Sequence, residues 1–181
     1  LDTWREKAEG RAVMDYGFHM IITDARPDVI EEMDSMVEQG VTSFKLFLAY
    51  PGVLMVDDDT LHQVMERAAD NGALVMIHAE HGPVIDRLVK RALADGNPDP
   101  GWHYRTRPST LEGESTSRAI AIAKVAGAPL YVVHVTCEEA VEAIAAARLR
   151  GERIWGETCT QYFYLTQNDL DRPAFEGAKY V

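Results

Sequence analysis

Three apolar stretches of the chain each contain one polar side chain capable of catalytic or metal-binding chemistry. Lys45 lies in FKLFLAY, His78 near the end of ALVMIHAE, and His134 near the end of PLYVVHVT. Phe47 and Ala49, which share the predicted face of Lys45, are apolar and indicate burial rather than an exposed strand face. A buried ammonium is costly unless it is paired or chemically changed. A lone strand histidine is usually a core residue, whereas two at equivalent strand ends favour metal ligation.

The remaining histidines give weaker signals. His19 lies in the middle of its apolar stretch, and we interpret it as a core or supporting residue. His62, His81 and His103 lie in predicted helix or loop, where simple exposure to solvent explains them. None of the four is taken as a candidate ligand.

Apolar stretches alternate with amphipathic ones along the chain. The predicted strands cover residues 16–22, 42–50, 73–80, 129–136 and 152–159. The predicted helices cover residues 26–40, 57–72, 83–96, 110–127 and 137–151. Residues 97–109 form an irregular segment too long for an ordinary connection, which we expect to lie near a surface or subunit contact. After residue 159 we expect loop with one short helix near residues 168–170.

This alternation predicts a parallel sheet covered by helices. Five such strands fit either an open doubly wound sheet or part of a (β/α)8 TIM-type barrel. No glycine-rich phosphate-binding motif follows any strand, which favours the barrel. A complete barrel needs about 250 residues, so the chain is expected to be an incomplete barrel holding about strands 3 to 7. In a barrel the carboxyl ends of the strands open onto one face, where Lys45, His78 and His134 are expected to converge.

Composition disfavours two classes of partner, nucleic acids and membranes. The formal net charge of the 181 residues is −11, from 18 Lys and Arg against 29 Asp and Glu, which disfavours nucleic acid. No apolar run approaches the ~20 residues that span a bilayer, so no membrane partner is expected. The N-terminal stretch LDTWREKAEGRA is charged throughout and does not resemble a signal peptide. The two cysteines are interpreted as reduced thiols, and we expect a cytoplasmic protein.

Four motifs carry a family resemblance over essentially the whole chain. They are SFKLFLAY, GALVMIHAEHGPVIDRLVKRAL, LYVVHVTCEEAVEAIAAAR and WGETCTQYFYLT. In order and spacing they resemble the dihydropyrimidinase/D-hydantoinase family of cyclic amidohydrolases. The resemblance implies a metal-dependent amidohydrolase barrel with a small additional β domain and two divalent metal ions, usually zinc. Residues 1–181 are then the central part of a single catalytic barrel domain, without the flanking strands and the small β domain.

The resemblance also implies roles for individual residues. Lys45 corresponds to a lysine that carbon dioxide converts to a carbamate bridging the two metals. His78 and His134 correspond to the histidines on the second metal. Tyr50 corresponds to a tyrosine that hydrogen-bonds the substrate and the developing oxyanion. The implied partners are a small cyclic amide or imide substrate and further copies of the chain in a homotetramer.

The chain departs from the family pattern at several points. It contains no HxH pair for the first metal, and the family's metal-bound Asp is expected beyond Val181. It therefore carries three of the six expected metal-site groups. Thr160 stands where the family usually has Pro, His81 where Asn is usual, and LAYPG replaces the common AYKN. These loop differences leave the substrate range open.

The implied reaction is hydrolysis of the cyclic amide bond of hydantoins or dihydropyrimidines, opening the ring to N-carbamoyl amino acids. Two alternatives remain: allantoinase or dihydroorotase chemistry, and a non-catalytic scaffold relative on the same fold. A scaffold has no need of Lys45, His78 and His134 together, so the sequence favours an enzyme. With half of the metal-site groups missing, the 181-residue chain alone is expected to be inactive.

Overall fold

The computed structural model describes all residues from 1 to 181. Its centre is one parallel sheet with the strand order β1-β2-β3-β4-β5. The strands are β1 (Met20–Ile21), β2 (Ser43–Phe47), β3 (Leu74–His78), β4 (Leu130–Val132) and β5 (Ile154–Gly156). The α-helices are α1 (Asp2–Ala8), α2 (Pro27–Glu38), α3 (Asp58–Asn71), α4 (Gly82–Ala94), α5 (Trp102–Arg105), α6 (Ser109–Ala126) and α7 (Glu138–Leu149). Three 3-10 helices follow: η1 (Thr160–Phe163), η2 (Gln167–Asp171) and η3 (Glu176–Tyr180).

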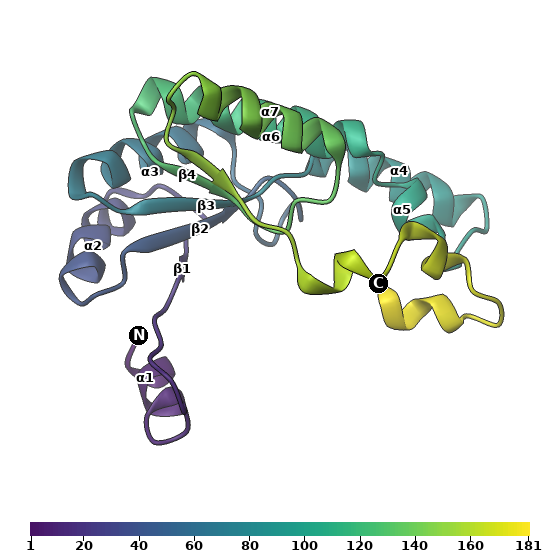
Figure 1. The fold of residues 1–181 in the computed structure, drawn as a ribbon, viewed down its shortest axis with the longest axis horizontal. Coiled ribbons are helices and arrows are strands. Elements are labelled where there is room, and N and C mark those ends of the chain that lie inside the picture. The colour runs from purple at the N-terminus through teal and green to yellow at the C-terminus, as the bar shows by residue number, and fades with distance from the viewer.

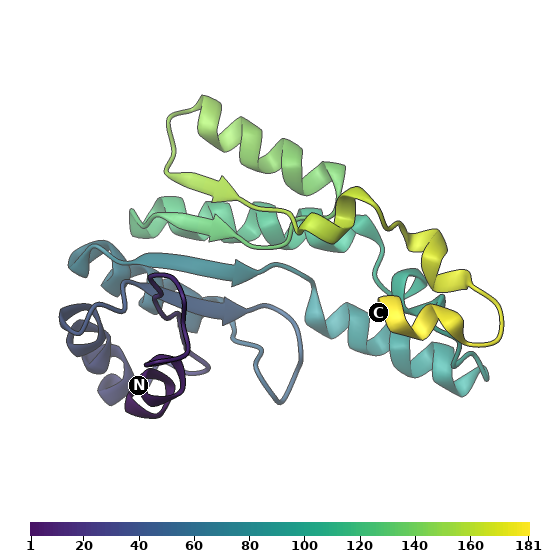
Figure 2. The same cartoon turned by 60° about the horizontal axis from the view of Figure 1, so that its bottom comes forward.

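The two faces of the sheet differ sharply. Helices α2, α3, α6 and α7 follow one another along one face (Figures 1 and 2). Alternate strand residues such as Phe44, Leu46, Val75 and Ile77 are fully buried there and form the core. The residues between them point to the other face, where Ile21 remains half exposed. Because successive strand side chains point to opposite sides, the sequence separates a helix-covered face from an open face.

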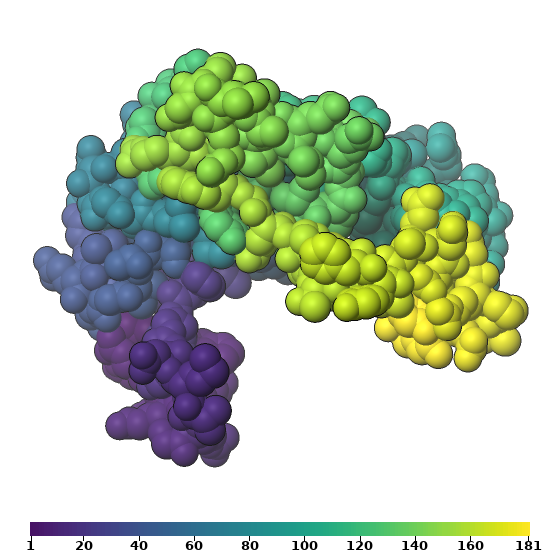
Figure 3. Space-filling view, in the orientation of Figure 1, coloured from purple at the N-terminus to yellow at the C-terminus, as the bar shows by residue number.

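The open face is bounded by both ends of the chain. Helix α1 projects from the sheet beside β1, while η1–η3 lie beyond β5 near α4 and α5 (Figure 1). The space-filling view shows a hollow between these two projecting segments (Figure 3).

No helix combines the length and the apolar character that crossing a membrane requires.

The predicted order of the five strands and the five helices between them is confirmed, but helix α1 was not predicted and several boundaries were wrong. The strand predicted at residues 16–22 contains only Met20 and Ile21, because only these two residues pair with β2. The strand predicted at residues 129–136 ends at Val132, before His134. The irregular segment 97–109 includes the one-turn helix α5, and the C-terminal region forms three 3-10 helices instead of one.

Helix α3 shows how local sequence sets an element's ends. Asp57 caps its first turn, where the carboxylate accepts a hydrogen bond of 2.8 Å from the backbone N–H of Thr60. Gly72 ends the helix in the left-handed conformation, with φ of 78°. The helix Asp58–Asn71 therefore begins and ends within one residue of the predicted range 57–72.

Gly82 joins the loops that follow β2 and β3. Its backbone N–H donates to the Leu48 carbonyl over 3.0 Å. A Cβ at this position would lie 2.8 Å from the Leu48 oxygen and 2.8 Å from the Ala49 Cα, both backbone atoms. Only glycine allows the two loops to approach this closely.

We predict that Gly82→Ala destabilises the protein by about 1–3 kcal/mol, because the new methyl group overpacks against backbone that must shift. Gly17→Ala is the matched control, since its Cβ meets nothing within 4 Å. We expect that control to change the free energy of unfolding by less than about 0.5 kcal/mol. Urea denaturation followed by circular dichroism measures both, and equal stabilities for the two variants would contradict the tight contact.

Candidate functional site

The pairing of β2 with β3 places Lys45 and His78 on the open face. Lys45 lies opposite Met76, and Phe47 lies opposite His78. Because alternate residues share a face, these four side chains all point away from the helices. His78 ends its strand, so it lies at the carboxyl end of the sheet.

His134 reaches the same place by a different route. It lies two residues beyond β4, and strict alternation would direct it toward the helices with Leu130 and Val132. Its φ of 44° is left-handed and breaks that alternation. As a result His134 Nε2 lies 3.0 Å from His78 Nδ1, with the two ring centroids 4.7 Å apart.

A carboxylate on α6 holds the turn that contains His134. The backbone N–H of Thr136 donates to Glu112 Oε1 over 2.8 Å, and the Thr136 hydroxyl donates to the same carboxylate. Charged acceptors make stronger hydrogen bonds than neutral ones. Glu112 therefore fixes the chain two residues after the unusual backbone angle.

Lys45 is half-buried and has no carboxylate partner. Its Nζ lies 3.7 Å from the centroid of the Phe47 ring, and it forms no ion pair. Burial lowers the pKa of Lys45 to about 8, and the charge of Glu157 opposes that shift. Burial also lowers the pKa of His134, and the charges of His78 and Lys45 lower it further.

Tyr50 lies just beyond β2 with φ of 66°. Its ring centroid is 5.1 Å from that of His78 and 6.0 Å from that of Phe47. Burial and the charge of Glu80 raise the pKa of Tyr50, while Arg107 opposes them. The phenol therefore keeps its proton at neutral pH and can donate a hydrogen bond at the rim of the site.

Glu80 and Arg107 belong to the site, although neither was predicted from the sequence. Glu80 Oε2 accepts from His78 Nε2 over 2.7 Å, and Arg107 Nε lies 3.8 Å from Glu80 Oε1. Burial alone would raise the pKa of Glu80, but the His78 hydrogen bond and the nearby cations lower it. The HAE triplet was the available signal, since a carboxylate two residues after a candidate ligand can reach its ring.

Two other histidines, His19 and His62, contact residues away from the cluster, and His103 differs from its expectation. His19 Nδ1 lies 2.6 Å from the Ser43 hydroxyl, at the amino end of β2. His62 faces Glu66 on α3 with 3.4 Å between Nδ1 and the carboxylate. His103, expected to be solvated, is instead partly buried, and burial and Arg107 lower its pKa while Glu80 opposes them.

The residues present fit part of a metal centre. Tetrahedral zinc with Zn–N bonds of 2.0–2.1 Å separates two ligand nitrogens by about 3.3–3.4 Å. The 3.0 Å between His78 Nδ1 and His134 Nε2 needs only a few tenths of an ångström to reach that value. The chain holds no cluster of three or more His, Cys, Asp and Glu side chains placed to bind a metal. Its candidate ligands are therefore two histidines and the unpaired Lys45.

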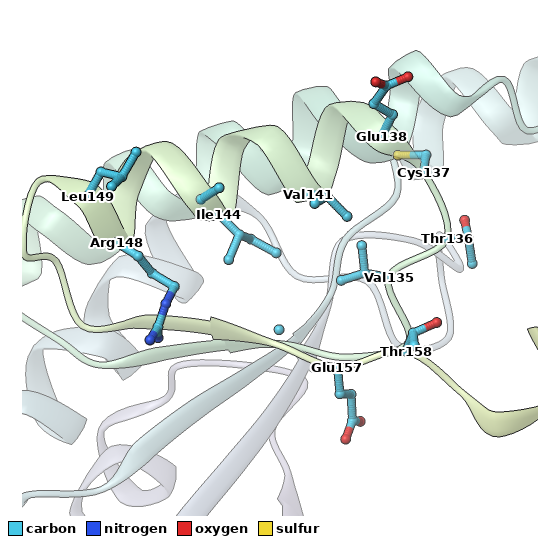
Figure 4. Close-up of a pocket in the computed structure, with 12 residues that line it drawn as sticks. Val135, Thr136, Cys137, Glu138, Val141, Ile144, Arg148, Leu149, Glu157 and Thr158 are labelled. Atoms are coloured by element: carbon cyan, nitrogen blue, oxygen red, sulfur yellow. The ribbon is translucent and has the colours of Figure 1, made fainter. Parts of the chain in front are cut away.

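A separate groove of about 930 Å³ runs between α7 and the end of β5. Val141, Ile144 and Leu149 line it from the helix, and neither candidate histidine contributes (Figure 4). Figure 4 shows Glu157 pointing away from α7, on the other side of β5, where its carboxylate accepts from the Tyr131 hydroxyl over 3.2 Å. The groove is thus distinct from the histidine cluster.

We predict that Lys45 acylates as an amine with a pKa of about 8 in the metal-free protein. Only the neutral amine reacts, so labelling of Lys45 should rise as the pH passes 8, about two units earlier than for an ordinary lysine. Competitive labelling with trace acetic anhydride and mass spectrometry measures this, with exposed Lys124 as the internal control. Equal pH profiles for the two lysines would show that Lys45 is not desolvated.

Comparison with known proteins gives strong matches over the whole chain. It is 54% identical over 182 residues to a D-hydantoinase of Geobacillus stearothermophilus, covering 100% of this chain and 39% of that protein. It is 55% identical over 181 residues to a D-hydantoinase of Streptomyces coelicolor, again covering 100% and 39%. No family model matches the chain.

A solved structure matches equally well. The crystal structure of dihydropyrimidinase from Brevibacillus agri is 55% identical, with a TM-score of 0.96 over 99% of this chain and 39% of that one. The match confirms the predicted fold class, a parallel α/β segment of an amidohydrolase barrel. The chain spans 39% of the length of the relatives it matches.

Proposed function

The chain belongs to the dihydropyrimidinase/D-hydantoinase family of cyclic amidohydrolases, and we propose that the whole protein hydrolyses the cyclic amide bond of hydantoins or dihydropyrimidines. The product is the ring-opened N-carbamoyl amino acid. The observation that carries the proposal is that Lys45 and His78 share the open face of one parallel sheet and that His134 Nε2 lies 3.0 Å from His78 Nδ1. These are the residue types that a binuclear hydrolase requires, on the face where barrel enzymes place their sites.

The proposed cofactors are two divalent metal ions, expected to be zinc. His78 Nδ1 and His134 Nε2 would hold one of them, and a carbamate on Lys45 would contact both. When bound, such ions lower the pKa of water and polarise a carbonyl. The remaining ligands would have to come from outside the 181 residues, which contain no HxH pair.

The environment of Lys45 supports its conversion to a carbamate. The neutral amine forms an N–C bond to carbon dioxide, and one amine proton is released to water. A lysine with a pKa of about 8 is partly neutral at physiological pH, unlike an ordinary lysine. Its nitrogen contacts only the Phe47 ring, at 3.7 Å, and the Leu46 carbonyl, at 3.5 Å, and no carboxylate holds it in the charged form.

Tyr50 is the proposed hydrogen-bond donor to the substrate carbonyl. Its protonated phenol lies beside His78, with 5.1 Å between ring centroids. A donor placed where negative charge develops stabilises the transition state more than the ground state. Tyr50 would therefore act on the tetrahedral oxyanion while the open face receives the ring.

The wider organisation follows the same proposal. We propose that residues 1–181 are the central part of one catalytic barrel domain, and that the whole protein is a cytoplasmic homotetramer. The family resemblance implies the tetramer and the barrel domain, and the two free cysteines support a reducing compartment. Because three of six metal-site groups are expected outside it, the 181-residue chain is proposed to be inactive by itself.

We predict that Lys45→Ala in the whole protein lowers kcat/KM for hydantoin and dihydrouracil by at least about 100-fold. The reason is that metal chemistry supplies several kcal/mol and each 1.36 kcal/mol is a factor of ten. Lys45→Arg should fail as well, since a guanidinium stays protonated. Ring opening measured by absorbance, with zinc content by plasma mass spectrometry, tests both variants.

The matched control is Lys90→Ala, which removes an exposed lysine paired only with Asp86. It should retain wild-type turnover and zinc content. Short carboxylic acids added to Lys45→Ala should restore part of the activity by replacing the carbamate oxygens. A fully active Lys45→Ala enzyme would reduce Lys45 to a structural role and remove the proposed metal bridge.

A further inference from the structure

We propose that Glu80 is a positioning residue that fixes the His78 ring with its proton on Nε2, leaving Nδ1 as the lone pair directed at the metal. The inference rests on the proposed function, because it concerns the same centre. It adds a residue whose carboxylate touches neither substrate nor metal and acts only through His78.

The position of Glu80 determines which nitrogen of His78 carries the proton. Glu80 Oε2 lies 2.7 Å from His78 Nε2, and the two side chains are only 19% and 10% exposed. An ionised carboxylate has no proton and can only accept, so Nε2 must donate. In a neutral imidazole the other nitrogen then carries the free lone pair. That nitrogen, Nδ1, is the one facing His134 at 3.0 Å.

Aromatic contacts hold the plane of the His78 ring, whichever ring nitrogen carries the proton. Phe47 stacks on His78 with 5.7 Å between centroids and 29° between planes, and Tyr50 lies against it at 5.1 Å. These contacts fix where the ring lies but are indifferent to which nitrogen is protonated. Without Glu80, a fraction of the protein would carry the proton on Nδ1, and its lone pair would point away from His134.

Arg107 orients the Glu80 carboxylate. Its Nε lies 3.8 Å from Glu80 Oε1, the oxygen not used by His78. Arg107 is itself anchored by Nη1, which donates to the His103 carbonyl over 3.1 Å and lies 3.3 Å from the Thr106 hydroxyl. A series of polar contacts therefore runs from Arg107, in the 97–109 segment, through Glu80 to His78.

The residues just before Arg107 are anchored as well. Arg105 forms two hydrogen bonds to the Asp171 carboxylate, at 2.8 and 2.9 Å, and the Tyr104 hydroxyl donates to it at 2.9 Å. Helix α5 is thus fastened to η2 while Arg107 reaches the histidine cluster. The segment was expected to serve only a surface or subunit contact, and this second connection gives it a route to the site.

The test compares Glu80→Gln and Glu80→Ala with the wild-type whole protein. The His78 tautomer is read from solid-state nitrogen-15 NMR of metal-free, histidine-labelled protein, with the His78 signals identified by their loss in His78→Gln. Zinc affinity is read by competition with a chelator. We expect wild type to show the proton on Nε2 and Glu80→Ala to show a mixture with zinc affinity lower by about 10–100-fold. Glu80→Gln should lie between them, because its amide oxygen can still accept from Nε2.

Glu66→Gln is the matched control, because Glu66 faces His62 on α3 far from the site. It should leave the His78 tautomer and the zinc affinity unchanged. A Glu80→Ala protein with the wild-type tautomer and zinc affinity would overturn the inference, because alanine leaves no acceptor for Nε2. If wild type binds no zinc through His78 and His134, the proposed function fails and the inference with it. If only the inference fails, wild type and the Glu80 variants bind zinc with equal affinity.

Discussion

The site depends on one constraint, the strict alternation of side chains along a parallel strand. In β2 this alternation sends Phe44 and Leu46 into the helix-covered core and leaves Lys45 on the open face. The register with β3 then adds His78 to the same face. A one-residue slip would exchange the two sets and bury a lysine against the helices, so the core and the site enforce the same register.

His134 belongs to the cluster only because it breaks this alternation. Its left-handed backbone costs energy for a residue with a Cβ, and such strain persists where surrounding contacts determine it. Here those contacts include the paired hydrogen bonds from Thr136 to Glu112 on α6. Helix α6 therefore stabilises the core and also fixes the direction of one candidate ligand.

Much of this organisation could be predicted from the sequence, because periodicity reports burial directly. The five strands, their order and the candidates Lys45, His78 and His134 all follow from apolar runs interrupted by polar residues. The left-handed turn could not be predicted, since it arises from tertiary contacts that no local pattern encodes. The interaction of Arg107 with Glu80 was missed for the same reason: it joins residues 27 positions apart through a segment that appeared irregular. Strand β1 is shorter than its apolar run predicted, because only Met20 and Ile21 pair with β2.

The central claim is that His78 and His134 direct their facing nitrogens at one metal ion. A crystal structure of the whole protein grown with zinc, with anomalous data collected at the zinc edge, tests it most directly. We expect an anomalous peak about 2.0–2.1 Å from both His78 Nδ1 and His134 Nε2, with a second zinc joined to it through modified Lys45. Catalytically active crystals with zinc bound elsewhere and an empty space between the two rings would contradict it.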